Sequence, residues 1–412
     1  MIAGAILSVR TLLLAIFVLM AGSGFLSTLI SVRLEARGAA PLLIGLVATM
    51  YFAGLTLGSL RVSAVIQRVG HIRAFAAFVS LFSASSLTYA VLEPVGVWAA
   101  LRFVDGLCMA GVFVCLESWL NERAETRTRG AILAAYMISL YSGQAVGQFL
   151  LNVGEEARPS LPFMASAILL SLAVIPVVLT RIAGPSLSTQ PPMGLARLYR
   201  LSPLAIVGAV VTGVMMGAFY GLGAVYAGRL GMDLSGIAVF MSAVIIGGVA
   251  LQWPLGRLSD VFDRRRVIVS AFGGATVAGL AMAAAGAPGP VLLLLGGLFG
   301  GISFALYPLC VAHANDHLSP EQRVGASGGL VLAYSTGAAA GPVLGAAAMT
   351  MLGAPGLFLF IGACAGGACA FALWRERIGM PVPSARQRPY QILPRTTPMS
   401  AALDPLAPGD TP

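Results

Sequence analysis

Lysine is absent from the sequence, and residues of either charge are scarce. All basic side chains are arginines, and only 10% of residues are charged, against about 25% in soluble domains, which excludes a soluble fold. The arginines lie mostly between apolar runs, so the net charge of +9 does not indicate a nucleic-acid partner. The five cysteines lie inside apolar segments without a C-x-x-C pair, so we interpret them as packing residues and expect no metal site or cofactor.

What the sequence has instead is long apolar segments. The chain is 58% hydrophobic, and its mean hydropathy is +0.89. A helix that crosses a bilayer needs about 20 apolar residues, so 412 residues suffice for roughly a dozen. The apolar runs predict an all-α membrane protein with twelve spans, at 11–32, 42–65, 73–92, 95–119, 131–152, 162–181, 203–227, 235–257, 267–286, 289–313, 324–349 and 354–374.

The arginines of alternate loops gather on one side of these spans. That side carries clusters such as Arg264, Arg265 and Arg266, whereas the other side carries only Arg33, Arg37, Arg158 and Arg229. By the positive-inside rule, the arginine-rich side is cytoplasmic. We therefore expect a multi-pass, monomeric protein of the bacterial cytoplasmic (inner) membrane with both termini cytoplasmic.

Four regions follow from the composition. Residues 1–181 and 203–375 would each form a six-helix bundle. Residues 182–202 would form a cytoplasmic linker, because this stretch is rich in proline and ends in a short basic amphipathic piece at 193–200. Residues 376–412 are rich in proline and polar side chains, so we expect a disordered cytoplasmic tail.

The two bundles repeat each other in sequence. At one offset, Gly106 matches Gly300, and the same offset matches further pairs: Asn121-Glu122 with Asn315-Asp316, Arg129 with Arg323, Gly143 with Gly337, and Gly147 with Gly341. A parallel duplication of six helices predicts two bundles related by a pseudo-two-fold axis along the membrane normal, with a cavity between them.

The most charged stretch between two spans is 253–266. Its Gly256-x-Leu258-x-Asp260 followed by Asp263 and three arginines is similar to the cytoplasmic signature G-x-L-x-D-R-x-G-R-R, and the chain thereby resembles the major facilitator superfamily. That family usually shows the signature most strongly after helix 2. Here the copy after the second span is degenerate, with Gln67 at the aspartate position.

Other motifs extend the resemblance over about residues 8–375. Arg102-x-x-Asp105-Gly106 resembles the helix-4 signature of proton-coupled members, and Gly337-x-x-x-Gly341-Pro342 resembles a weak copy of the antiporter motif. The segment around Glu117-Ser-Trp-Leu-Asn121 is similar to the uncharacterised YcaD-type branch. The resemblance implies the major facilitator fold and transport of a small molecule across the lipid bilayer.

The span at 95–119 carries its charges on one face. At 100° per residue, a stripe about 120° wide contains Arg102, Asp105, Met109, Phe113 and Glu117. A charge near mid-membrane costs about 2.5–3.5 kcal/mol on insertion scales, so this stripe must face a wet cavity or a partner.

Three interpretations of this stripe remain open. Asp105 takes up a proton while Arg102 tunes it, or the two form a static pair, or they contact a charged substrate. Glu117 either snorkels toward the cytoplasmic surface, or bonds Arg127 or Arg129, or forms part of an inner gate.

The family resemblance places helices 1, 4, 7 and 10 around the cavity. The candidate substrate contacts on the other three helices are Gly24, Phe25, Thr28, Tyr220, Tyr226, Phe304 and Tyr307. Aromatic residues at such positions are core packing as often as ligand contacts. The matching helix of the second half has no arginine or aspartate at the corresponding positions, which favours a neutral or weakly cationic, fairly apolar solute.

We expect the stretch at 253–266 to act as a conformational latch at the cytoplasmic end. Its residues are Gly256, Asp260, Asp263, Arg264, Arg265 and Arg266, and the degenerate copy offers Gln67, Arg68 and Gly70. Asp260 would bind a helix N-terminus or an arginine across the bundle. We predict that Asp260→Asn slows transport more than Gln67→Ala does, measured as initial rates in the same vesicles; equal effects would contradict this asymmetry.

These observations favour a secondary transporter, with proton-coupled efflux as the first hypothesis. An uptake symporter or uniporter is the second, and a transport-inactive receptor or scaffold is the third. No nucleophile motif or nucleotide-binding loop is present, which argues against an enzyme or an ATP-driven pump.

Overall fold

The computed structural model describes residues 2–124, 127–153, 158–179, 193–319, 322–378, 387, 389–392 and 394–397. Within these residues the chain is helical and has no strand. The first half contains α1 (Ile2–Ser23), α2 (Leu26–Ala36), α3 (Pro41–Val69), α4 (His71–Val91), α5 (Val95–Arg123), α6 (Arg129–Gln148), the 3-10 turn η1 (Phe149–Val153) and α7 (Leu161–Val178). The second half contains α8 (Leu195–Leu201), α9 (Pro203–Arg229), α10 (Leu234–Val261), α11 (Arg264–Ala284), α12 (Pro290–Asn315), α13 (Arg323–Leu352) and α14 (Gly356–Ile378).

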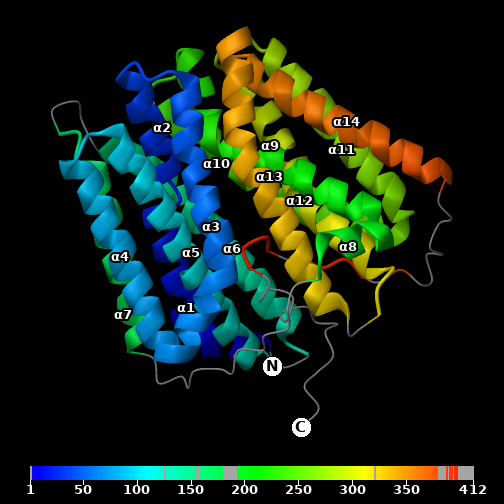
Figure 1. The fold of residues 1–412 in the computed structure, drawn as a ribbon, viewed down its shortest axis with the longest axis horizontal. Coiled ribbons are helices and arrows are strands. Elements are labelled where there is room, and N and C mark those ends of the chain that lie inside the picture. The colour runs from blue at the N-terminus through cyan, green and yellow to red at the C-terminus, as the bar shows by residue number, and fades with distance from the viewer. Residues whose placement is uncertain are drawn as a thin grey trace.

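These helices confirm the twelve-span architecture. In the described residues, eleven segments are long and apolar enough to cross a membrane, with α1 and α2 counted as one segment interrupted at Gly24 and Phe25. The twelfth is α6, which carries Gln144 and Gln148 and is less apolar, but it packs along α1. Figure 1 shows the two halves side by side, with α1 to α7 in blue to green and α9 to α14 in green to orange.

Local sequence explains where several helices begin and end. Proline occupies the first turn of α3, α9 and α12, where its missing N–H is not needed. The side chains of Asp233 and Asp263 cap α10 and α11 by accepting backbone N–H bonds. Gly70 ends α3 with a φ of 87°, a conformation that other residues rarely adopt.

Matched glycines bring helices into contact in both halves. A Cβ added at Gly106 would lie 2.0 Å from the backbone oxygen of Tyr51 on α3, and one added at Gly300 would lie 2.0 Å from that of Val244 on α10. These glycines occupy matched positions of the sequence repeat. The two halves therefore use the same backbone contact at the same place, which supports a parallel duplication.

We expect Gly106→Ala to lower the stability of the fold by about 1–3 kcal/mol, because the new methyl group would overlap backbone atoms that cannot move independently. Gly367→Ala on α14 is the matched control, since a Cβ there meets nothing within 4 Å. Thermal unfolding in detergent measures both. Equal midpoints for the two variants would contradict this packing role.

Direct bonds between the halves cluster at one end of the bundle. Among the described residues, Ser31 donates to Gly221 O, Thr49 to Ala339 O and Ser242 to Ala145 O, at 2.8, 2.8 and 2.9 Å. Arg229 pairs with Glu35 at 2.7 Å near the ends of α9 and α2. We call this the closed end, and the end that carries the α3–α4 and α10–α11 junctions the tail-side end.

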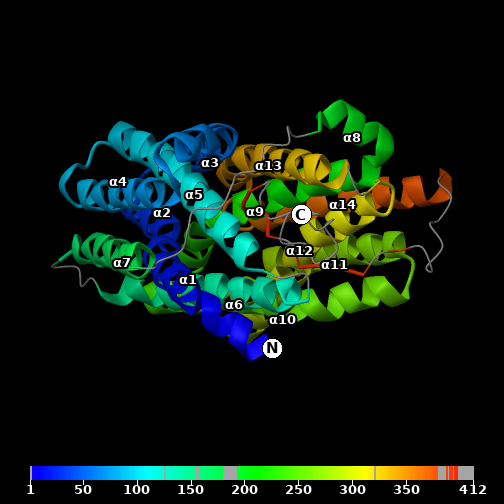
Figure 2. The ribbon, with the colours of Figure 1, turned by 90° about the horizontal axis from the view of Figure 1, so that it is seen from below.

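Part of the C-terminal segment lies between the halves at the tail-side end. Figures 1 and 2 both show short stretches of it, drawn in red, between the first-half helices and α12. The described residues of this segment are 387, 389–392 and 394–397, and they contact helices of both halves. The disordered tail expected from composition stays a prediction. The expected linker falls mostly on residues outside the described ones and stays a prediction. Its basic part contains the short helix α8.

Candidate functional site

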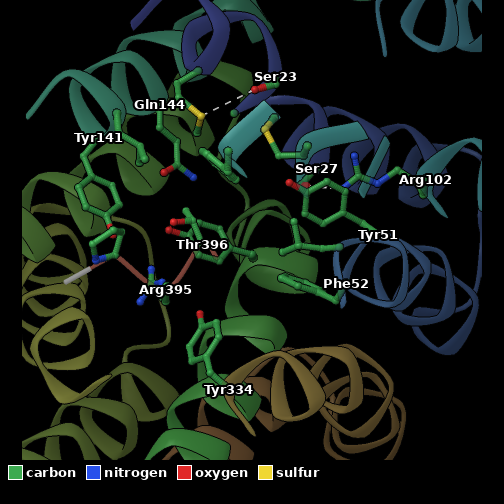
Figure 3. A pocket seen from close by; sticks show the side chains of 18 residues that line it. Ser23, Ser27, Tyr51, Phe52, Arg102, Tyr141, Gln144, Tyr334, Arg395 and Thr396 are labelled. Carbon is green, nitrogen blue, oxygen red and sulfur yellow. Dashed lines mark hydrogen bonds between the residues drawn. The ribbon is translucent and has the colours of Figure 1, made fainter. Parts of the chain in front are cut away.

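A cavity lies between the two halves, and its lining residues come from both. The space between them is about 880 Å³, counting the part that is open to solvent. Figure 3 shows polar side chains that converge on it from several helices and from the C-terminal segment. The lining residues are Met20, Ser23, Gly24, Ser27, Tyr51, Phe52, Leu55, Arg102, Met109, Phe113, Leu140, Tyr141, Gln144, Tyr220, Tyr334, Pro394, Arg395 and Thr396.

Arg102 lies on the cavity wall and is held from two sides. Its guanidinium carbon lies 4.3 Å from the centroid of the Tyr51 ring, and its Nη2 donates to Ser27 Oγ at 2.6 Å. The side chain is only 3% exposed. Packing on an aromatic face stabilises a guanidinium that has left bulk water. Arg102 is therefore a fixed positive charge beside the cavity.

Asp105 lies behind Arg102, away from the cavity lining. Its side chain is fully buried, and its Oδ2 accepts a hydrogen bond from the Tyr89 hydroxyl at 2.7 Å. The same oxygen lies 3.7 Å from Arg102 Nη1, which makes an ion pair without a close hydrogen bond. Burial of an ionised carboxylate costs free energy unless the group is paired or takes up a proton. The arrangement can thus couple the protonation of Asp105 to the position of Arg102.

Glu117 lies further along α5 toward the tail-side end, and its partners differ from the expected arginines. The carboxylate is fully buried and accepts a hydrogen bond from the Tyr136 hydroxyl of α6 at 2.9 Å. Thr396 and Thr397 of the C-terminal segment donate their hydroxyls to the two carboxylate oxygens. Within the described residues, Glu117 therefore bonds hydroxyl groups and not Arg127 or Arg129, which were the expected partners.

The stripe on α5 is split by the structure. Arg102, Met109 and Phe113 line the cavity, whereas Asp105 and Glu117 reach it only through their neighbours. Both α3 and α4 pack against α5, so the cavity exposes only part of a stripe about 120° wide.

The expected wall residues also divide into lining and packing positions. Gly24 and Tyr220 line the cavity, and Phe304 packs against Tyr141 with ring centroids 5.2 Å apart. The other expected wall residues are buried in the helix packing: Phe25, Thr28, Tyr226, whose hydroxyl donates to Met282 O, and Tyr307, which packs on Tyr334.

Sequence reasoning missed the parts of the wall that come from α3, α6 and α13. Tyr51 and Phe52 belong to α3, and Tyr334 belongs to α13. On α6, Tyr141 and Gln144 are three residues apart and so lie on one face. Because these two polar side chains share one face of an otherwise apolar span, the sequence could have indicated that α6 lines the cavity.

The charged stretch at the α10–α11 junction is organised around Arg264. This side chain is 1% exposed, and it binds Asp316, which directly follows α12, at 2.6 Å and Asp260 at 3.3 Å. Both carboxylates belong to the second half. We expected Asp260 to bind an arginine across the bundle; among the described residues it pairs instead with Arg264, four residues further along the chain. Asp260 also accepts the backbone N–H of Tyr390, at 2.7 Å.

The remaining latch residues occupy the surface of the same junction. Arg265 pairs with Asp263 at 3.1 Å, and Arg266 pairs with Glu376 at 3.2 Å. Burial would raise the pKa of Asp263, but hydrogen bonds from Arg265 and the nearby positive charges lower it on balance. This pair therefore stabilises the fold at neutral pH and loses that effect as the pH falls through the lowered pKa.

The degenerate copy of the stretch is exposed in the first half. Gln67 and Arg68 are exposed at the end of α3, and Gly70 supplies the turn into α4. Asp260, the counterpart of Gln67, is also exposed, so these two positions differ in the ion pair that Asp260 makes and not in burial. Gly256 faces the ring of Tyr390, so the latch position contacts the C-terminal segment.

Comparison with known proteins places this geometry in a family. The family model described as Major Facilitator Superfamily matches residues 12–286 and 205–406. An uncharacterized MFS-type transporter YcaD from Escherichia fergusonii is 30% identical over 337 residues, which cover 81% of this chain and 87% of that protein. The YcaD protein of Salmonella heidelberg is 30% identical over 356 residues, covering 86% and 91%.

Solved structures share the fold at low identity. The nucleoside transporter NupG has a TM-score of 0.73 at 14% identity and covers 90% of this chain and 98% of its own. A bacterial homologue of the human lysosomal transporter Spinster, in an inward-facing and occupied conformation, has the same score and identity and covers 90% and 96%. A D-xylose-proton symporter scores 0.66 at 15% identity and covers 90% and 97%. The chain belongs to the major facilitator superfamily, and the relatives it matches are YcaD-type transporters.

Proposed function

We propose that the protein is a secondary active transporter that exports a small organic solute in exchange for protons by alternating access. The observation that carries the proposal is the fully buried carboxyl of Asp105 directly behind Arg102 on the cavity wall. A proton bound by Asp105 would weaken its hold on Arg102, and the freed guanidinium would alter the cavity that binds the solute. Protonation and solute binding would then be linked through one side chain.

The arrangement of the halves supports a cavity that opens to one side at a time. Their direct bonds gather at the closed end, and the cavity extends toward the tail-side end. The arginine-rich loops belong to the tail-side end, so the positive-inside rule makes it cytoplasmic. The solute would then enter from the cytoplasm of a bacterium, and the junctions at Gly70 and Asp263 would lie on the cytoplasmic face.

Transport by purified protein in proteoliposomes tests the proposal. A panel of organic cations, nucleosides and sugars is added outside vesicles whose lumen is acidic, alkaline or equal in pH to the outside. Solute–proton exchange predicts accumulation of at least one solute only when the lumen is acidic, because outward proton flow then drives the solute inward.

The other outcomes separate the alternatives. Accumulation with an alkaline lumen would show a symporter that serves uptake, which is the coupling named for the xylose transporter of the same fold. Movement that is independent of the pH difference would show a uniporter. If no solute in the panel moves, the transport proposal fails and a receptor or scaffold becomes the better interpretation.

A further inference from the structure

The C-terminal segment reaches the cavity from the tail-side end and is held there at three points. The backbone N–H of Tyr390 donates to Asp260 Oδ1 at 2.7 Å, and the Tyr390 ring lies against Gly256 of α10. Pro394, Arg395 and Thr396 line the cavity, and the hydroxyls of Thr396 and Thr397 bind Glu117 on α5. The segment thereby connects α10 of the second half with α5 of the first.

Arg395 occupies an aromatic part of the cavity. Its guanidinium carbon lies 4.5 Å from the centroid of Phe304 and 5.4 Å from that of Tyr334. Figure 3 shows the side chain between Tyr141 and Tyr334. Aromatic faces attract a cation through their negative charge density, and the attraction is larger where water is excluded.

Glu117 supplies the negative charge of the same region. Its carboxylate is fully buried, and the hydrogen bonds described for it come from three hydroxyl groups. Hydroxyl groups satisfy the oxygens but do not neutralise the charge. A buried carboxylate is stabilised further by a cation close enough to pair with it. Aromatic rings and a carboxylate are together the groups that recognise an organic cation.

We infer that the part of the cavity beside the Phe304 and Tyr334 rings is a binding site for a small organic cation, and that Arg395 occupies it as a competing internal ligand. Glu117 adjoins this part through Thr396 and supplies its negative charge. The inference rests on the proposed transport function and specifies its substrate class. The sequence favoured a neutral or weakly cationic solute, and the inference restricts this class to organic cations.

Occupation by the segment has a consequence for the transport cycle. The halves are already in contact at the closed end, so alternating access requires the tail-side end to close in turn. Pro394, Arg395 and Thr396 line the cavity that this closure must remove. The segment therefore has to leave before each turnover, and it lowers both cation binding and transport while it is docked.

Binding of phenylguanidinium to detergent-solubilised protein tests this inference without a pH gradient or transport. Isothermal titration calorimetry compares the full chain with a chain that ends at residue 386 and with the full-length Arg395→Gln variant. Both changes are expected to tighten binding at least about tenfold, because the internal ligand is removed. Arg395→Gln keeps the test valid if the shortened chain does not fold.

Two further comparisons separate cation recognition from the removal of an obstacle. Phenylurea has a similar shape without the charge and should bind the shortened chain at least about tenfold more weakly than phenylguanidinium does. Glu117→Gln in the shortened chain should weaken phenylguanidinium binding at least about tenfold. A peptide of residues 387–398, added to the shortened chain, should restore the weaker binding of the full chain.

The inference is overturned if neither the shortened chain nor Arg395→Gln binds phenylguanidinium more tightly than the full chain, or if phenylurea binds equally well. Either result leaves proton-coupled transport untouched, because transport is judged by the response to a pH difference. Conversely, tight cation binding without pH-driven accumulation would contradict the proposed coupling and leave the site in place.

Discussion

Asp105→Asn is expected to abolish the accumulation of solute driven by a pH difference, and to make solute binding independent of pH at the affinity that the native protein has with Asp105 protonated. Asparagine preserves the shape of the side chain and can still accept a hydrogen bond from Tyr89, but it does not take up a proton. The variant should therefore carry solute only until its concentrations inside and outside are equal. Uptake into proteoliposomes with an acidic lumen measures the difference.

A matched carboxylate provides the control for that experiment. Glu93 pairs with Arg37 at 3.3 Å, but its side chain is 77% exposed and remote from the cavity lining. Glu93→Gln removes the same charge and should retain native accumulation. If Asp105→Asn also accumulates solute, the pair with Arg102 is a static element of the helix packing, and the coupling site must be sought elsewhere.

Arg264→Ala is expected to destabilise the fold by about 3–5 kcal/mol. Arg264 and Asp316 are each 1% exposed, and their charged groups lie 2.6 Å apart. Removal of the arginine takes the Arg264 guanidinium away from the buried carboxylate of Asp316, and the cost of burying that charge is then offset less. The midpoint of thermal unfolding in detergent should fall accordingly.

Arg266→Ala is the control for the same junction. Arg266 pairs with Glu376 at 3.2 Å, but its side chain is 74% exposed, so the loss should be about 0–1 kcal/mol. The double variant Arg264→Ala/Asp316→Ala should recover part of the lost stability because the buried carboxylate is removed together with the guanidinium that paired with it. Equal midpoints for the two single variants would show that burial does not increase the contribution of the Arg264 ion pair to the stability of the fold.

The helices could be located from sequence because their ends are marked chemically. Apolar runs stop at arginine, proline or glycine, and the expected span 203–227 becomes α9 at Pro203–Arg229. The break between α1 and α2 was not expected, since one glycine in an apolar run does not by itself predict an interruption. The repeat was visible because close helix contacts require glycine at matched positions such as Gly106 and Gly300.

The partners of the buried charges could be predicted only within one helix. The spacing of Arg102 and Asp105 brings them together on α5, and the structure has them 3.7 Å apart. Tyr89 and Tyr136 lie on neighbouring helices, and helical periodicity does not give the rotation of one helix against another. The contacts of Glu117 with Thr396 and Thr397 join positions that are distant in the chain. Composition alone gave no reason to place that polar, proline-rich segment in a cavity.

Proton movement driven by solute is the most direct test of coupled transport. Proteoliposomes that contain the native protein and a pH-sensitive dye are prepared with equal pH on both sides, and an organic cation that the protein carries is added outside. Exchange predicts that the lumen becomes more alkaline as the cation enters, and that Asp105→Asn shows no such change. Entry of the cation without any proton movement by the native protein, or the same proton movement in Asp105→Asn, would contradict coupling through this carboxylate.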